Sequence, residues 1–184
     1  MTRSTLVTIW AELVADQASP AGHVSTVAVP ADGAALAGAC SGMDIEHNKA
    51  VIREFDELGN GGGDIDRIDA LCTPDIVNHA LAPGRPQGIE GTREFLRSAR
   101  RNVHPVRWIE SHVVAESDLV VQFGTREQYW PGGSFRGFEI PSGLFRRDTA
   151  FAYLLVDGRI SERWAIRDDL GMMLQLGAII EPAP

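Results

Sequence analysis

The sequence lacks the cysteines of a disulfide framework or of a structural zinc site. Its 184 residues include two cysteines, Cys40 and Cys72, which lie far apart and form no C-x-x-C motif. Small secreted domains that depend on disulfides carry many more cysteines than this. Cys72 lies on the apolar side of a predicted helix, as a small buried side chain does. We therefore expect a cytoplasmic protein in a reducing compartment.

Positive charge is scarce as well, and long apolar runs are missing. The chain carries 17 lysines and arginines against 25 aspartates and glutamates, a net charge of −8. This excess of acid repels phosphate backbones and anionic lipid surfaces, so we expect neither a nucleic-acid nor a membrane partner. No segment approaches the roughly 18 apolar residues of a membrane span. Glu12 and Asp16 interrupt the apolar run near the N-terminus, which is atypical of a signal peptide.

Motifs of several large enzyme classes are absent too. There is no Gly-x-Ser-x-Gly elbow and no phosphate-binding Gly-x-x-x-x-Gly-Lys. The glycines of residues 59–63 follow a predicted helix rather than a strand, unlike a dinucleotide-binding loop. The five histidines show no metal-ligand spacing. These enzyme classes therefore find little support in the sequence, and we expect no metal site.

The composition divides the chain into two parts. Residues 1–42 are rich in alanine, glycine and other small residues and show no sustained hydrophobic period. We interpret them as an arm that is either loose or docked on a partner subunit. Residues 43–184 have the size and the composition of one globular domain.

Within residues 43–184, helical periodicity comes first and strand periodicity second. The predicted helices are residues 44–59, residues 64–72 and the segment that follows the loop 82–88. The predicted strands are residues 106–115, 119–130, 144–156 and 159–168, with a short extended segment at 76–79. Asp157-Gly158 is a strong hairpin signal. We expect an α+β fold in which a curved antiparallel sheet wraps around the helices and encloses an interior, with an apolar segment at 170–180 over its open end.

The last predicted strand ends in an acid that is a candidate catalytic group. Strict alternation places Glu162, Trp164, Ile166 and Asp168 on the same, mostly apolar side, which we interpret as the inward side. A carboxyl group in such a place is desolvated, and this suits it to exchange protons near neutral pH. Two structural interpretations stay open for Asp168: an ion pair with a nearby arginine, and a cap on the segment that begins at Leu170.

Other candidate pocket residues come from the preceding strand and from the segment before the loop 82–88. Phe151 and Tyr153 belong to an alternating set that either lines a ligand pocket or packs a core. Of the neighbours Asn78 and His79, one should face inward. A single histidine is more often structural than functional.

Short motifs lie in a distinctive order between Asn48 and Gly177. They are Asn48-Lys49-Ala50-Val51, Gly62-Gly63-Asp64, Pro74-Asp75-Ile76-Val77-Asn78-His79, Pro83-Gly84, Gly88-Ile89-Glu90-Gly91, the stretch 132–143 with Phe135, Ile140 and Pro141, and the stretch 157–171 followed by Gln175-Leu176-Gly177. The whole segment from Asn48 to Gly177 resembles the SnoaL-like polyketide cyclases of the NTF2-like superfamily. The resemblance implies a cone-shaped α+β barrel, a homodimer, and cofactor-free chemistry in the cavity. It also implies that Asp168 is the general acid/base and that His79 donates a hydrogen bond to a substrate carbonyl.

The chain departs from the family pattern at several positions. Arg163 stands where the family usually has histidine, and Asp56, next to Phe55, stands where many members have tyrosine. Phe151 and Tyr153 occupy positions where cyclases often have aspartate or histidine. These changes leave fewer polar groups opposite Asp168, and they make Asp56 a candidate second acid.

Three functions agree with these observations. The first is a cyclase or isomerase that uses Asp168 on a small, hydrophobic, polyketide-like or other carbonyl substrate, with Asn78, His79 or Tyr153 near the oxyanion and apolar walls from Phe55, Phe151, Trp164 and Ile166. The second is an epoxide-opening or ether-ring-forming enzyme, in which Asp56 supplies the second acid. The third is a non-catalytic ligand-binding domain. A carboxylate of Asp56 that pointed away from the interior would weaken the second hypothesis.

Overall fold

We analysed a computed structural model that describes residues 42–102 and 106–179, with side chains from Ile45 onward. The predicted arm, apart from Gly42, lies outside the described residues. The three predicted helices are confirmed as α2 (Gly42–Gly59), the pair η1 (Ile65–Arg67) and α3 (Ile68–Leu71), and α4 (Gly88–Asn102). Cys72, which we expected on the second of these helices, is instead the first residue of a strand, β1 (Cys72–Asn78), and it is buried there. Asp64 caps η1 because its side chain accepts a hydrogen bond from the Asp66 amide. A fourth α-helix, α5 (Asp169–Gln175), lies in the segment that we expected to cover the end of the sheet.

The described residues form one large sheet and one small hairpin. The sheet has the order β1 (Cys72–Asn78), β7 (Arg159–Arg167), β6 (Gly143–Val156), β3 (Leu119–Trp130) and β2 (Val106–Glu116). Four of these strands match the long antiparallel strands that the alternation predicts, and β1 adds a parallel strand beside β7. The hairpin consists of β4 (Gly133–Phe135) and β5 (Phe138–Ile140), and it follows the turn at Pro131.

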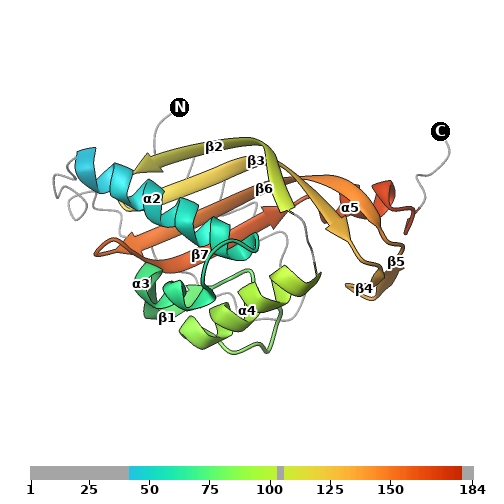
Figure 1. The fold of residues 1–184 in the computed structure, drawn as a ribbon, viewed down its shortest axis with the longest axis horizontal. Coiled ribbons are helices and arrows are strands. Elements are labelled where there is room, and N and C mark those ends of the chain that lie inside the picture. Colours follow the sequence, from blue (N-terminus) through green and yellow to red (C-terminus); the bar gives the residue numbers. More distant parts are fainter. Residues whose placement is uncertain (1–41, 103–105, 180–184) are drawn as a thin grey trace, which may run out of the picture. The chain divides into compact units, whose positions relative to one another are not determined.

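Helices α2, α3 and α4 pack on one face of the sheet, which we call the inner face (Figure 1). The main hydrophobic core lies between them, with Phe55 and Leu58 from α2, Leu96 from α4, and Phe151 and Tyr153 from β6. A second cluster, made of Trp130, Ile140, Phe145 and Met172, joins α5 and the β4–β5 hairpin to the other end of the sheet. The inner face therefore has two apolar ends, and the residues between them are largely polar.

The alternation in β7 differs from the prediction because of a β-bulge. Leu155 pairs with Ile160, but the next pair is Leu154 with Glu162, so Ser161 is an extra residue. One extra residue moves every later side chain to the opposite face. Ile160 is fully buried, as strict alternation predicts. Beyond the bulge, however, Arg163 lies opposite Tyr153 on the inner face, with Ala165 and Arg167 following it, whereas Glu162, Trp164 and Ile166 lie on the outer face. The predicted inward set of this strand is therefore wrong.

Candidate active site

Four arginines converge on the polar middle of the inner face. Arg126 of β3 lies directly opposite Arg147 of β6, and Arg167 of β7 lies opposite Thr149 of β6. Arg163 lies two positions before Ala165 on the same face of β7. Burial lowers the pKa of Arg126, Arg147 and Arg167, and it brings that of Arg147 to about 10. Two largely buried carboxylates, those of Asp56 and Asp169, lie within 4 Å of three of these cations, Arg126, Arg147 and Arg167.

Asp56 contacts the inner face of the sheet from α2. Its Oδ2 accepts hydrogen bonds from the indole Nε1 of Trp108 at 2.6 Å and from the amide of Asn60 at 3.0 Å. Arg126 lies 3.8 Å from Oδ1 and also donates to the side-chain oxygen of Asn60. Among the described residues no hydrogen bond reaches Oδ1. One carboxylate oxygen is thus fixed, and the other remains able to accept a proton.

Arg163 lies among aromatic rings rather than among acids. Its guanidinium carbon is 4.8 Å from the ring centre of Phe151, and the rings of Phe55, Phe95 and Tyr153 are 5.2 to 6.0 Å away. Its NH1 donates to the side-chain oxygen of Asn78 at 3.2 Å. Cation–π contacts of this kind stabilise a desolvated guanidinium.

The ring of Phe151 is a neighbour that Arg126 and Arg163 share. Arg126 lies 5.4 Å from the Phe151 ring centre and 5.0 Å from that of Trp108, whose ring meets Phe151 edge-on. Arg163 and Arg126 therefore approach the same phenyl ring. Beside it, burial raises the pKa of the Tyr153 hydroxyl to about 12, which makes Tyr153 a hydrogen-bond donor rather than a base near neutral pH.

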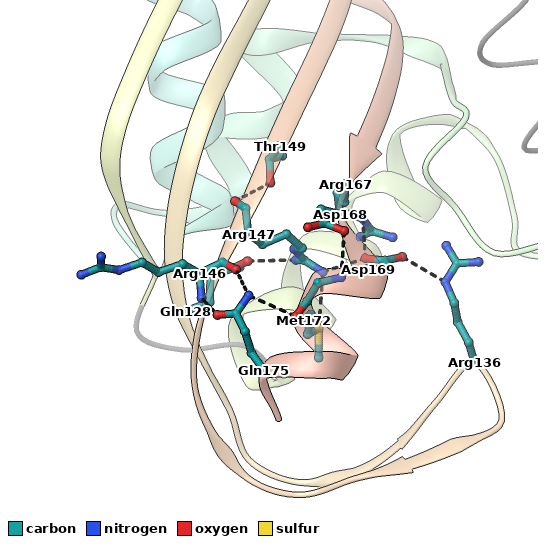
Figure 2. A network of polar contacts seen from close by, with 11 residues as sticks. Gln128, Arg136, Arg146, Arg147, Thr149, Arg167, Asp168, Asp169, Met172 and Gln175 are labelled. Carbon is teal, nitrogen blue, oxygen red and sulfur yellow. Dashed lines mark hydrogen bonds and ion pairs between the residues drawn. The ribbon is translucent and has the colours of Figure 1, made fainter. Parts of the chain in front are cut away.

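Asp169 links α5 to the sheet through three arginines (Figure 2). Its Oδ1 accepts from Arg147 at 2.8 Å and lies 3.7 Å from Arg167, and its Oδ2 accepts from Arg136 at 3.0 Å. Arg147 also donates to Gln128 at 2.9 Å. This network satisfies most of the charge on Arg147, so we assign Arg147 and Asp169 a structural role.

Several buried polar atoms of the inner face have no hydrogen-bond partner among the described residues. They are Nε of Arg126, Arg147 and Arg163, Oε1 of Gln122 and Nε1 of Trp130. Buried polar groups in folded proteins are almost always paired with protein or with water. A concentration of unpaired ones along one face is typical of a surface that binds a polar ligand or ordered water.

Asp168 does not lie on the inner face. It is exposed, it follows the last residue of β7, and its side chain accepts a 2.8 Å hydrogen bond from the amide of Gly171. It is the N-cap of α5, which was the structural alternative that the sequence left open. The predicted burial of Asp168 is therefore wrong.

His79 lies on the outer face together with Trp164. Its side chain is 41% exposed, its Nε2 lies 3.0 Å from Glu162, and its ring stacks on the indole of Trp164 at 4.8 Å. Asn78 is the member of the pair that faces inward, as we expected of one of them, and it is fully buried. Ile166 lies half-buried on the outer face, opposite Ala150.

The structure thus brings together only part of the predicted site. Phe55, Asp56, Asn78, Phe151 and Tyr153 lie on or against the inner face, whereas His79, Trp164, Ile166 and Asp168 do not. The sequence analysis missed Trp108 and Arg126, and it named Arg163 only as a departure from the family pattern. The signal that could have found Arg126 is its place in an alternating set of β3 with Val120, Gln122 and Gln128, all of which are buried.

Two absences concern the part of the chain that the structure describes. In that part, no three histidine, cysteine or acidic side chains converge as the ligands of a metal ion would. None of its helices combines the length and the apolar character that crossing a bilayer requires.

The sequence matches the family model of the SnoaL-like polyketide cyclases over residues 49–176. No curated protein matches it. Solved structures with the same fold include TsrD of Streptomyces laurentii, which is 24% identical with a TM-score of 0.61 over 73% of this chain and 97% of that one. IdmH of Streptomyces antibioticus is 25% identical with a TM-score of 0.58 over 71% and 98% of the two chains. A SnoaL-like polyketide cyclase of Agrobacterium tumefaciens is 16% identical with a TM-score of 0.59 over 71% and 98%.

Proposed function

The chain belongs to the family of SnoaL-like polyketide cyclases, and from this membership we propose that it is a cofactor-independent cyclase or isomerase of a small carbonyl compound. The fold alone does not fix an activity, so the proposal depends on the inner face. The observation that carries it is the carboxylate of Asp56, which has one oxygen held by Trp108 and the other free of hydrogen bonds among the described residues.

In the proposed reaction, Asp56 takes the place that the sequence analysis gave to Asp168. Its Oδ1 removes a proton from the carbon α to a substrate carbonyl, and the electron pair of that C–H bond forms an enolate. The guanidinium of Arg126, 3.8 Å from the same oxygen, donates a hydrogen bond to the enolate oxygen. The enolate carbon then attacks a second carbonyl of the same molecule and closes a ring. The proton on Asp56 passes to the new alkoxide, so the enzyme returns to its starting state.

The apolar part of the substrate would lie against the aromatic side chains. Phe151 and Trp108 adjoin Arg126, and Phe55 contacts Tyr153 edge-on at 5.9 Å. Such rings position a planar carbon skeleton and exclude water from the reacting atoms. The Tyr153 hydroxyl is a candidate second donor to an oxyanion.

Exchange of α-protons tests the base without knowledge of the natural substrate. We would incubate the protein in D₂O with 4-acetylbenzamide, a neutral aryl methyl ketone, and follow loss of the methyl signal by NMR. We expect the wild-type chain to accelerate the exchange, and Asp56→Asn to reduce it by about 10²- to 10⁴-fold, the usual contribution of a general base. Asp75→Asn, which changes an exposed aspartate of β1, is the control and should leave the rate unchanged.

The same assay separates Asp56 from the sequence-based candidates. Asp168→Asn keeps an acceptor for the Gly171 amide, so we expect wild-type exchange from it. If Asp168→Asn or His79→Gln abolished exchange while Asp56→Asn did not, the assignment of Asp56 would be wrong. If none of the proteins exchanged protons, the non-catalytic binding domain would be the better description.

We also propose that the outer face of the sheet pairs with a second copy of the chain. Two rows of mostly apolar side chains cross four strands there: Val114, Val121, Ala152 and Trp164, and, beside them, His112, Phe123, Ala150 and Ile166. Phe123 is 40% exposed in the single chain. Apolar patches that extend over several strands are typical of protein–protein contacts.

Light scattering of the full chain tests this pairing. We expect a particle of twice the 20.0 kDa chain mass, and a monomer after Phe123→Glu. Phe138→Glu, on β5, makes the same exchange at a similarly exposed phenylalanine away from these rows and should remain dimeric. A monomeric wild-type chain would contradict the proposal.

A further inference from the structure

Arg163 is a buried cation for which the structure offers no carboxylate. It is 5% exposed, and no acid lies within ion-pair distance of it among the described residues, whereas Arg126 and Arg147 each face an aspartate at 3.8 and 2.8 Å. Its hydrogen-bond acceptors are neutral, namely the amide oxygen of Asn78 and the hydroxyl of Tyr153, and its Nε has no partner in the described part of the chain. Charged side chains are almost never fully buried unless they are paired.

The neighbouring charges increase this imbalance rather than correct it. Beside burial, the positive charge of Arg163 lowers the pKa of Arg126 and of Arg167, so the three guanidinium groups repel one another. Asp56 pairs with Arg126, and Asp169 pairs with Arg147, Arg167 and Arg136. The inner face therefore holds an excess of positive charge in a chain whose net charge is −8.

The aromatic rings around Arg163 restrict the kind of molecule that could supply a negative charge to it. Rings stabilise a guanidinium through their faces, but they carry no charge and leave the cation without a counter-ion. The same rings suit a flat, apolar carbon skeleton. Arg163 and Arg126 lie 4.8 and 5.4 Å from the centre of the Phe151 ring, so this ring is a neighbour that the two guanidinium groups share.

We propose that the substrate is an organic acid whose carboxylate pairs with the guanidinium of Arg163 while its reacting carbonyl lies beside Arg126 and Asp56. A planar guanidinium matches the two oxygens of a carboxylate, and the Nε of Arg163 is a buried donor that still lacks an acceptor among the described residues. This inference rests on the proposed function for the place of the reacting carbonyl, but the pairing with Arg163 is a matter of binding alone.

Two probes of equal shape test the pairing. We would measure by calorimetry the Kd of 4-acetylbenzoate, which carries a carboxylate, and of 4-acetylbenzamide, which is neutral. Hydrogen bonds to charged groups predict that the wild-type chain binds the carboxylate about ten- to hundredfold more tightly. Arg163→Met should bring this ratio close to one through weaker binding of the benzoate, with the benzamide unchanged. The control Arg107→Met, at an exposed arginine of β2, should keep the wild-type ratio.

Loss of the buried guanidinium could also prevent folding, so a second variant is included. Arg163→Gln keeps a donor for Asn78 and removes the charge, and it should lose the preference in the same way. Equal Kd values for the two probes on the wild-type chain would overturn the proposal, and so would a preference that persists in Arg163→Met or Arg163→Gln. In that case the rings and Asn78 are the whole environment of Arg163, and its role is structural.

The two proposals can fail independently. Asp56→Asn should retain the preference for the benzoate and lose α-proton exchange. If the wild-type chain prefers the benzoate but exchanges no protons, the anion site is supported and the proposed reaction is refuted. If it exchanges the protons of both probes and binds them with equal Kd values, the proposed reaction is supported and the anion site is refuted.

Discussion

Neutralising Asp169, whose side chain is 15% exposed, should destabilise the domain strongly. The variant Asp169→Asn keeps the size of the side chain and one acceptor oxygen but removes the charge that Arg147 faces at 2.8 Å. Arg147 is 7% exposed in its side chain, so it cannot turn to solvent. It would be left with Gln128 and the sulfur of Met172, next to the positive charge of Arg167.

The magnitude follows from the burial of the pair. Removal of one partner from a fully buried ion pair costs about 3–5 kcal/mol of unfolding free energy. The side chain of Asp169 is 15% exposed and the amide of asparagine still accepts a hydrogen bond, so we expect about 2–3 kcal/mol. In a domain of this size that loss lowers the melting temperature by roughly 4–12 °C.

Urea unfolding monitored by tryptophan fluorescence would measure the loss. The control is Arg136→Gln, which removes the partner of Asp169 on the exposed side; its side chain is 62% exposed, and we expect a change below about 1 kcal/mol. Combining Asp169→Asn with Arg147→Met should recover part of the loss, because no unpaired charge then remains buried. An Asp169→Asn variant within about 0.5 kcal/mol of the wild type would refute the view that this carboxylate neutralises Arg147.

Three further predictions each concern a change at a single residue. Asp168→Ala should cost about 1 kcal/mol of unfolding free energy in urea titrations, whereas Asp168→Ser, which can also cap a helix, should cost little; equal losses would contradict the capping role. Gly124→Ala should cost about 2 kcal/mol or more, because Gly124 has φ +148 and a Cβ there would overlap the carbonyl oxygen of Glu110, whereas Gly59→Ala meets ordinary contacts and should be tolerated. Burial raises the pKa of Tyr153 from 10.0 to about 12, so between these pH values the folded state keeps a proton that the unfolded state loses. The contribution of the buried, protonated hydroxyl to the unfolding free energy is therefore complete below pH 10 and is lost as the pH rises to 12. The unfolding free energy of the wild type relative to Tyr153→Phe should therefore fall by about 2–3 kcal/mol over that interval, and a constant difference would contradict the burial of the hydroxyl.

The architecture could be predicted from the sequence because its elements have clear periods and clear ends. Four strands with period two and the turn Asp157-Gly158 leave few alternatives for the sheet, and Asp64 and the glycines after Asn60 mark the helix ends. The pairing of β1 with β7 could not be predicted in this way. It joins residues far apart in the sequence, and no local pattern records it.

The candidate site was predicted less well, and one residue accounts for the errors on β7. Alternation is a local rule, and it held up to Ile160. The extra residue Ser161 has no distinctive local signature, since its hydroxyl simply donates to the carbonyl of Leu154. It placed Arg163 inside and Trp164 outside, and Asp168 then fell at the start of α5. The resemblance to a family did not correct this error, because it pointed to the same position.

The position of the last strand, β7, between β1 and β6 has a consequence for how the chain folds during synthesis. β1 leaves the ribosome early and has no strand beside it until β7 arrives, since β7 separates it from β6. β1 therefore cannot pair with another strand until nearly the whole domain has been synthesised, and contacts of such long sequence separation form slowly. Nascent chains that stop before residue 159 would expose an unpaired edge of β6, so premature termination should yield aggregates rather than smaller folded fragments.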